Sequence, residues 1–245
     1  QLTAFDDDWG ALHRGIEKES LRVKSNGNIS HSPHPNRLGS ALTNPYITTD
    51  FSEALLELIT PVSQTIDGCL QELENIHRYT QQNIENDEIL WATSMPCPLS
   101  ADTEIPIAQY GKSNIGKLKT LYRHGLHHRY GSLMQAIAGI HYNFSMPDSF
   151  WESYKPLCKF KGSIQEFKTE KYLHLIRNFH RFSWLLLYLF GASPTACKCF
   201  VEGRTHDLSE LDGSTLFKPF ATCLRMGNLG YKSKAQQSSP ASGDV

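Results

Sequence analysis

The stretch RGIEKESLRV, residues 14–23, sets two glutamates one residue apart between arginines. If it forms a β-strand, successive side chains point to opposite faces, so Glu17 and Glu19 lie side by side on one face. Two neighbouring carboxylates repel each other unless water, a basic partner or a metal ion neutralises them. An isolated pair of this kind is also typical of a solvated strand face, so the stretch predicts a strand without settling its chemistry.

The composition favours one globular domain with almost no net charge, so any ionic site must be a local cluster. The chain has 245 residues and a mass of 27.7 kDa, enough to bury a sizeable core. Its 24 basic and 25 acidic residues nearly cancel, which argues against nucleic acid or an anionic membrane as a partner. The six cysteines contain no C-x-x-C motif, and residues 1–9 do not resemble a signal peptide. We therefore expect reduced cysteines and a cytoplasmic location.

Apolar periodicity predicts both helices and strands. The apolar run over 54–60 is bounded like a strand, although residues 51–59 fit the start of a helix as well. Residues 135–145 alternate between apolar and polar side chains and predict a second strand with a polar face. The run FSWLLLYLF at 182–190 is shorter than the ~20 residues of a membrane span, so we expect a buried helix. The other expected elements are a loop over 25–40, helices over 65–84, 113–130 and 170–190, and a helix end with positive φ at Gly191.

Four groupings of polar residues stand out, and each has a structural explanation besides a functional one. They are Glu17 with Glu19, Asp50 with Glu57, His141 with Asn143, and Arg225 with Tyr231. Asp50 follows two threonines and can cap a turn, and Glu57 can be a charge on the exposed side of an edge strand. His141 can be a hydrogen-bonded core histidine. Taken singly, none of these groupings establishes a site.

Taken together, the groupings predict a metal site. Glu57 lies among leucines, where a carboxylate needs a partner that offsets its desolvation. If three antiparallel strands carry Glu17 with Glu19, Glu57, and His141 with Asn143 on one face, they form a concave wall of hard oxygen ligands with one imidazole. Such a donor set suits Mg²⁺ or Mn²⁺ rather than zinc. The segment YGKSN at 110–114 is not a phosphate-binding loop, because Pro106 stands where G-x-x-x-x-G-K-[ST] requires glycine.

Several long blocks of the chain carry a resemblance to a known family. They are RGIEKESLRV, LGSALTNPYITTDFSEALLELITPV, RYTQQNI, SMPCPL, AQYGKSNIGKLKTLYRHGLHHRYGSLMQAIAGIHYNFSMP and YLFGASPTAC. In this order, from about residue 13 to Tyr231, the chain resembles the amino-terminal half of bacterial-type glutamate-cysteine ligases. We therefore expect residues 1–231 to be the amino-terminal part of that catalytic domain and residues 232–245 to be a disordered tail.

The resemblance implies a reaction and a fold. The reaction is the ATP-dependent ligation of the γ-carboxyl group of L-glutamate to L-cysteine through γ-glutamyl phosphate, the first step of glutathione biosynthesis. The implied cofactor is Mg²⁺ (or Mn²⁺), and ATP is a cosubstrate. The implied fold is α+β, an antiparallel, glutamine-synthetase-like sheet with flanking helices that is incomplete relative to the family.

The resemblance also implies site residues, carried over position by position. The metal ligands are Glu17, Glu19, Asp50, Glu57 and His141, and the neighbouring residue that binds the nucleotide is Asn143. The residues around the cysteine substrate are Phe51, Tyr122, Arg225 and Tyr231. The residues with direct catalytic roles are Glu17, Glu57 and Arg225.

Two other interpretations stay open at the level of sequence. The chain can be a truncated, non-catalytic paralogue or fragment that binds a nucleotide or an amino acid, but retention of every acidic ligand argues against this. It can also be a metal-dependent phosphoryl-transfer enzyme with another substrate. In either case an incomplete antiparallel sheet leaves an unpaired edge, so we expect self-association through that edge.

Overall fold

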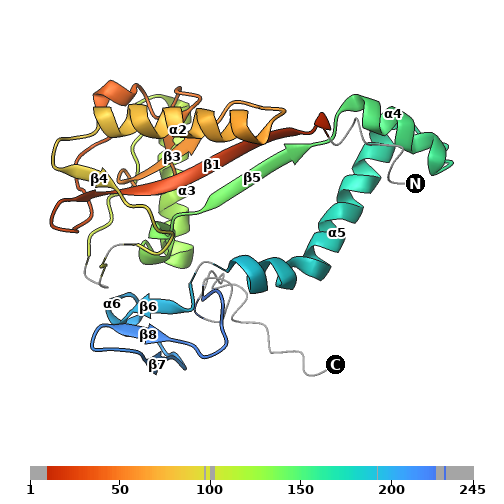
Figure 1. Cartoon of the computed structure of the whole chain (residues 1–245). Coiled ribbons are helices and arrows are strands. Elements are labelled where there is room, and N and C mark those ends of the chain that lie inside the picture. Colours follow the sequence, from red (N-terminus) through yellow and green to blue (C-terminus); the bar gives the residue numbers. More distant parts are fainter. Residues whose placement is uncertain (1–9, 97, 100–102, 192, 225–228, 230–245) are drawn as a thin grey trace.

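The computed structural model of the chain describes residues 10–96, 98–99, 103–191, 193–224 and 229 (Figure 1). Its strands are β1 (His13–Lys24), β2 (Ile47–Thr49), β3 (Leu55–Ile59), β4 (Glu88–Leu90), β5 (Ile140–Ser145), β6 (Thr195–Cys197), β7 (Ser209–Glu210) and β8 (Thr215–Phe217). Its helices are α2 (Ile66–Asn83), α3 (Asn114–Tyr130), α4 (Asp148–Leu157), α5 (Ile164–Phe190) and α6 (Lys198–Val201), with short 3-10 helices η2 (Asn36–Leu38) and η3 (Leu133–Ala136). These elements confirm the predicted α+β class with an antiparallel sheet.

The main sheet is built around the long strand β1. β3 pairs antiparallel with one side of β1, and β2 pairs antiparallel with β3. β4 and β5 follow one another along the opposite side of β1, and both are antiparallel to it. β5 is therefore an edge strand, because no other strand of the described residues pairs with it. A separate three-stranded sheet has the order β6-β8-β7.

Hydrophobic packing on both faces of the main sheet explains this arrangement. On one face, Leu21 and Leu55 are opposite each other in the β1–β3 ladder and belong to a buried cluster against which Leu126 of α3 packs. On the other face, Leu56 and Leu58 form a second buried cluster, against which side chains of α2 pack. The amphipathic helix α2 therefore covers one face of the sheet, while α3 packs against part of the other.

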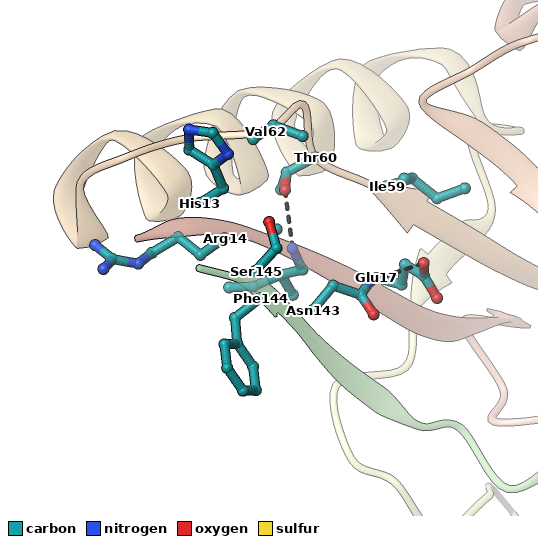
Figure 2. A pocket seen from close by; sticks show the side chains of 11 residues that line it. His13, Arg14, Glu17, Ile59, Thr60, Val62, Asn143, Phe144 and Ser145 are labelled. Carbon is teal, nitrogen blue, oxygen red and sulfur yellow. Dashed lines mark hydrogen bonds between the residues drawn. The ribbon is translucent and has the colours of Figure 1, made fainter. Parts of the chain in front are cut away.

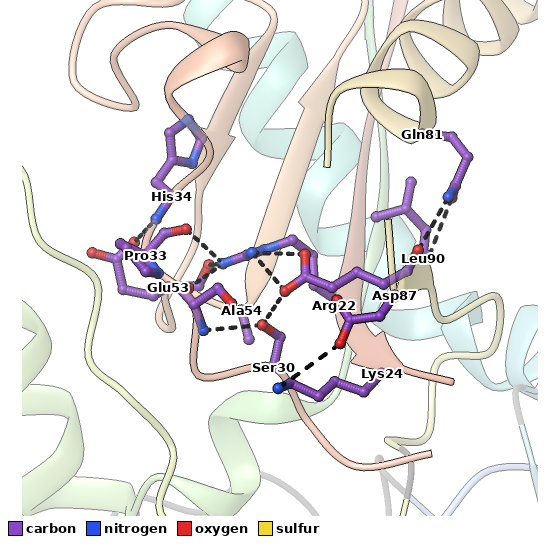
Figure 3. A network of polar contacts seen from close by, with 12 residues as sticks. Arg22, Lys24, Ser30, Pro33, His34, Glu53, Ala54, Gln81, Asp87 and Leu90 are labelled. Atoms are coloured by element: carbon purple, nitrogen blue, oxygen red, sulfur yellow. Dashed lines mark hydrogen bonds and ion pairs between the residues drawn. The ribbon is translucent and has the colours of Figure 1, made fainter. Parts of the chain in front are cut away.

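A buried ion pair connects the end of β1 to the loops around it (Figure 3). The guanidinium of Arg22 donates to both carboxylate oxygens of Glu88, at 3.1 and 2.9 Å, and both side chains are fully buried. Arg22 Nη2 also donates to the carbonyl of Glu53 at 3.0 Å. The Glu53 carboxylate accepts from the backbone N–H groups of His34, at 3.2 Å, and Gln109, at 2.9 Å. The network thus holds the turn between β2 and β3 in a fixed position.

Helix α5 differs from the sequence prediction in its burial. Residues 182–190 are helical as predicted, but Phe182, Trp184 and Phe190 are 55%, 62% and 76% exposed. The helix packs against α4 near its own start, around the buried side chain of Phe167, and stands clear of the main sheet (Figure 1). The prediction of a buried helix is wrong for this chain, because the apolar run has no covering layer in the described residues. Among those residues, no helix is long and apolar enough to cross a membrane.

The end of α5 and the small sheet also differ from expectation. Gly191 has φ −55°, so positive φ is not the reason for glycine there. A Cβ at this position would instead clash with the carbonyl oxygens of Leu187 and Thr222, which approach closely. Strands β2, β4, β6, β7 and β8 are not predicted from the sequence, because each has only two or three residues and shows no periodic pattern. The five cysteines among the described residues are free.

Candidate functional site

The candidate site lies on the face of the main sheet against which α3 packs. Along β1 this face changes from buried Leu21 to Glu19, which is 7% exposed, and then to Glu17, whose side chain is 33% exposed. The antiparallel register sets Glu19 opposite Glu57 of β3 and Glu17 opposite His141 of β5. Directly opposite residues point to the same face, so the alternation along β1 brings four polar side chains together. This is the arrangement that the sequence predicts for the three strands.

Three of these side chains place their ligand atoms within reach of one ion. Glu17 Oε2 lies 3.2 Å from Nδ1 of His141, and Glu17 Oε1 accepts a hydrogen bond from the Asn143 side-chain amide at 2.9 Å. A carboxylate oxygen of Glu17, one of Glu57 and a ring nitrogen of His141 all lie within 4.8 Å of one another. Figure 2 shows Glu17 and Asn143 meeting between β1 and β5. Such a cluster can surround a single cation.

Glu19 is held by the backbone that leads into β5. The N–H of Gly139 donates to Oε2 of Glu19 at 2.6 Å, and the N–H of Glu19 donates to the Gly139 carbonyl at 3.0 Å. A Cβ at Gly139 would lie 3.2 Å from Nε2 of His141 and 3.5 Å from both carboxylate oxygens of Glu19. A side chain there would crowd the site. Sequence reasoning missed Gly139 as a functional position, although an isolated glycine in a strand pattern often marks a close approach of this kind.

The structure also corrects the start of the strand that carries His141. The sequence predicts a strand over 135–145, but residues 133–136 form η3 and β5 begins only after Gly139. Ala138 is buried in the core cluster on the same face of the sheet. The apolar alternation before β5 therefore reflects the packing of a bent segment. That bend brings the N–H of Gly139 to Glu19.

The surroundings of Glu57 disfavour its charged form. Burial is the largest cause, and the nearby carboxylates of Asp50, Glu19 and Glu17 act in the same direction. His141 acts in the opposite direction. Together these influences raise the pKa of Glu57 from 4.5 to about 7. Four carboxylates with one imidazole lack positive charge, and this deficit is what a bound cation relieves.

Asp50 lies in the turn between β2 and β3, and α3 holds that turn. Arg123 of α3 donates through Nε to the Asp50 carbonyl and through Nη2 to the Thr49 carbonyl, the latter at 3.3 Å. The Arg123 guanidinium lies over the ring of Tyr110, 4.5 Å from its centroid. The Tyr110 hydroxyl donates to the Thr49 carbonyl at 2.7 Å. Sequence reasoning missed Arg123 and Tyr110, because neither segment indicates which distant backbone it contacts.

Of the four residues expected around the cysteine substrate, the structure describes two. Phe51 is 1% exposed and belongs to the core cluster on the α3 side of the sheet. Tyr122 is 63% exposed on α3. Arg225 and Tyr231 lie outside the described residues, as does the expected tail over 232–245. The roles of these four residues stay predictions.

An open pocket of about 350 Å³ adjoins the cluster (Figure 2). Glu17 and Asn143 line it together with Arg14 and Thr60. The N–H of Ile16 donates to Thr60 Oγ1 at 2.9 Å, which fixes the pocket wall between β1 and the end of β3. A pocket of this size beside charged side chains can accept a phosphate or amino-acid group.

The donor set fits Mg²⁺ or Mn²⁺. Both ions bind carboxylate oxygens, and Mn²⁺ also accepts an imidazole nitrogen. Glu17, Glu57 and His141 supply this combination, with their ligand atoms within 4.8 Å of one another. The residues present are therefore compatible with the predicted metal.

Comparisons of the sequence point to one family of ligases. The chain matches the family described as Glutamate-cysteine ligase over residues 5–244, a wider range than the resemblance over 13–231. It is 54% identical over 227 residues to a glutamate-cysteine ligase of Alcanivorax borkumensis and 55% identical over 227 residues to one of Hahella chejuensis. Both alignments cover 93% of this chain but 43% of the relative. The chain thus spans less than half of the length of these curated relatives.

Solved structures give the same picture. The chain is similar to the glutamate-cysteine ligase of Francisella tularensis, crystallised in complex with AMP, with a TM-score of 0.83 and 43% identity. That match covers 93% of this chain and 44% of the other. A bifunctional glutathione synthetase from Pasteurella multocida matches with a TM-score of 0.73 and 34% identity, over 82% of this chain and 26% of the other.

Proposed function

The chain belongs to the glutamate-cysteine ligase family, and from this premise we propose that it supplies the metal-binding part of such a ligase. The proposed reaction joins the γ-carboxyl group of L-glutamate to the amine of L-cysteine, with ATP as cosubstrate. The observation that carries the proposal is the convergence of Glu17, Glu57 and His141 on one face of three antiparallel strands. Carboxylates that could hold a divalent cation beside an open pocket provide what phosphoryl transfer to a carboxylate needs, a cation that neutralises charge on the transferring group.

We assign the metal to this cluster. Glu17, Glu57 and His141 would hold Mg²⁺ or Mn²⁺, with Glu19 and Asp50 completing the acidic surroundings. When bound, the cation neutralises charge on the transferring phosphoryl group and on the ATP phosphates.

The side chains of this chain position the ligands. Asn143 donates to Glu17 Oε1 and so orients that carboxylate, while the N–H of Gly139 does the same for Glu19. Burial raises the pKa of Glu57 and so favours its protonated form. A bound cation would lower this pKa and release the proton.

We further propose the predicted roles of the remaining residues. Phe51, Tyr122, Arg225 and Tyr231 would surround the cysteine substrate, and Asn143 would lie next to the nucleotide. Arg225 would stabilise the oxyanion that forms when the cysteine amine attacks γ-glutamyl phosphate. We expect the enzyme in the cytoplasm, since the substrates are small metabolites.

The first test is Mn²⁺ binding by the purified chain, followed by electron paramagnetic resonance. Substitutions Glu17→Gln and Glu57→Gln should each weaken binding by about tenfold or more, since each removes a ligand. Glu72→Gln on α2 is the matched control, because it removes one carboxylate from an exposed position away from the site. Equal affinities in all four proteins would refute the metal assignment.

The second test addresses the reaction. Phosphate release from ATP is measured with the chain, Mg²⁺, and glutamate and cysteine added singly and together, both alone and after addition of the part of the Alcanivorax borkumensis ligase that this chain does not match. The proposal predicts turnover that requires both amino acids. ATP consumption independent of either amino acid would favour another phosphoryl-transfer reaction and overturn the ligase assignment.

A further inference from the structure

A second open pocket lies on the opposite face of the main sheet, between β1, the end of β4 and α2. Its volume is about 470 Å³, and its polar lining residues are Lys18, Ser20, Glu74, His77, Arg78 and Gln81. Lys18 and Ser20 alternate along β1 with Glu17 and Glu19, so their side chains point away from the metal cluster. The sheet therefore separates this pocket from that cluster.

The pairing of the strands leaves room for this pocket. On the side of β1 that faces β4 and β5, β5 pairs as far as Lys18, and β4 pairs from Arg22 onward. α2 contributes four lining side chains, at positions 74, 77, 78 and 81, a spacing that puts them on one side of the helix. The Gln81 amide connects α2 to β4: it donates to the Glu88 carbonyl at 3.3 Å and accepts from the Leu90 N–H at 3.4 Å (Figure 3). These bonds fix one wall of the pocket.

The ammonium group of Lys18 lines this pocket without a counter-charge. Its Nζ donates to Ser20 Oγ at 2.5 Å and to the backbone carbonyl of Glu19 at 3.5 Å. Both acceptors are neutral, and Lys18 forms no ion pair with a carboxylate in the part of the chain that the structure describes. Ser20 is fully buried, so its hydroxyl holds the ammonium group from beneath. A half-buried ammonium group in this position is stabilised by an anion next to it.

The other charged groups leave the pocket with a net positive charge. Arg78 and Glu74 form an ion pair at 2.6 Å, and both side chains are 60% exposed, so their charges cancel at the open rim. His77 is more buried than this pair. Burial and the positive charge of Lys18 both lower the pKa of His77. His77 is therefore neutral above pH 7, and its imidazole offers one N–H donor.

We propose that this pocket binds a phosphate group, either as free phosphate or as part of a small phosphate ester. Its donors are the Lys18 ammonium, the His77 imidazole and, at the rim, the Arg78 guanidinium. Lysine and arginine are the side chains that proteins commonly use for phosphate. A phosphate dianion has more acceptor oxygens than a carboxylate, so it can reach donors that come from both β1 and α2. This site does not depend on the proposed ligase activity.

The experiment follows His77 by nuclear magnetic resonance while inorganic phosphate is added. The purified chain carries carbon-13 in its histidines and is kept in EDTA at pH 8, so that no metal ion can hold phosphate at the metal cluster. The imidazole signal of His77 is identified by its loss in His77→Gln, and sodium chloride keeps the ionic strength constant. The signal should shift with phosphate and reach saturation. No shift with phosphate, or an equal shift with sodium acetate, would overturn the proposal.

Variants of β1 locate the bound phosphate. Lys18→Met should raise the Kd for phosphate by about tenfold or more, since it removes a charged donor. Lys24→Met is the matched control, because Lys24 lies on the same strand and face but outside the pocket, with its Nζ 4.0 Å from the carboxylate of Asp87. Lys18→Arg keeps the positive charge, so it should bind phosphate more tightly than Lys18→Met. Equal affinities in Lys18→Met and Lys24→Met would overturn the proposal.

The rim provides a test that does not disturb the fold, because Arg78 and Glu74 are exposed on α2. Arg78→Gln should weaken phosphate binding and Glu74→Gln should strengthen it, each by about threefold, since the two substitutions change the charge beside the anion in opposite directions. Changes of the same sign in both variants would overturn the proposal.

A parallel titration with glycerol 3-phosphate distinguishes the two sources of the phosphate group. Tighter binding than that of inorganic phosphate would support a small phosphate ester as the ligand. Weaker binding would support free phosphate. Binding of either ligand that is insensitive to Lys18→Met would place it outside this pocket and overturn the proposal.

Discussion

Replacing Glu57 with glutamine should stabilise the metal-free chain near pH 8. In the folded state burial and the neighbouring carboxylates raise the pKa of Glu57 from 4.5 to about 7. A carboxyl group with a raised pKa binds its proton more tightly in the folded state than in the unfolded state. Its contribution to stability is therefore greatest below about pH 4.5 and is lost as the pH rises from there through about 7.

The size of the effect follows from the same pKa. A change from 4.5 to about 7 corresponds to a cost of about 3 kcal/mol for the ionised side chain at pH 8. Because Glu57 is only half-buried, solvent screening reduces this to about 1–2 kcal/mol. Glutamine carries no charge at any pH, so the variant should gain that amount at pH 8 and roughly half of it at pH 5, where the unfolded-state carboxyl group is already mostly ionised.

Urea unfolding in the presence of EDTA, followed by circular dichroism at pH 5 and pH 8, measures both free energies. Glu72→Gln provides the control, since it removes a carboxylate from the exposed side of α2. Saturating Mn²⁺ should reverse the order at pH 8, because an ion at 100 times its Kd stabilises the wild type by about 2.7 kcal/mol. A variant that is destabilised at pH 8 without metal, or that differs from wild type equally at both pH values, would refute the electrostatic argument.

Three further predictions concern the frame around the site. Glu88→Gln should lower the free energy of unfolding by about 3–5 kcal/mol in urea, because it leaves the fully buried guanidinium of Arg22 without its counter-charge. Arg123→Met should weaken Mn²⁺ binding by about tenfold while leaving the far-ultraviolet spectrum unchanged, because Arg123 holds the backbone carbonyl of Asp50. Ser163→Ala should speed hydrogen exchange in the first turn of α5 and cost about 1 kcal/mol there, since it removes the side-chain half of a capping box.

A specific measurement would contradict each of these three predictions. Arg78→Gln breaks an exposed pair with Glu74 and should cost less than about 1 kcal/mol, so an effect as large as that of Glu88→Gln would contradict the role of burial. Unchanged Mn²⁺ affinity in Arg123→Met would show that the turn holds its shape without α3. Unchanged exchange in Ser163→Ala would show that the cap is not what starts the helix.

The local pattern of the sequence was sufficient to predict the strands and helices that carry the site. An E-x-E pair in a strand puts both glutamates on one face, and LLELI puts a carboxylate among leucines, because side-chain direction in a strand depends on residue number alone. The same reasoning predicted helices close to α2 and α3 from their three- and four-residue apolar steps. The alternation of side chains within each strand could thus be predicted before any contact was known, while a shared face for Glu17, Glu57 and His141 was a hypothesis that required the strands to pair in the right register.

Register and backbone course depended on the tertiary structure. The pairing of Glu19 with Glu57, the bend that brings Gly139 to Glu19, and the hold of Arg123 on the Asp50 carbonyl join segments far apart in the chain. A local pattern carries no information on which distant segment it will meet.

Burial was decided by the tertiary structure as well. The sequence by itself determined that residues 182–190 are helical and apolar, and that alternate residues of β5 are apolar. Only the tertiary structure decided that these side chains face outward, because hydrophobicity measures the free energy that burial would release and not whether a covering surface is present.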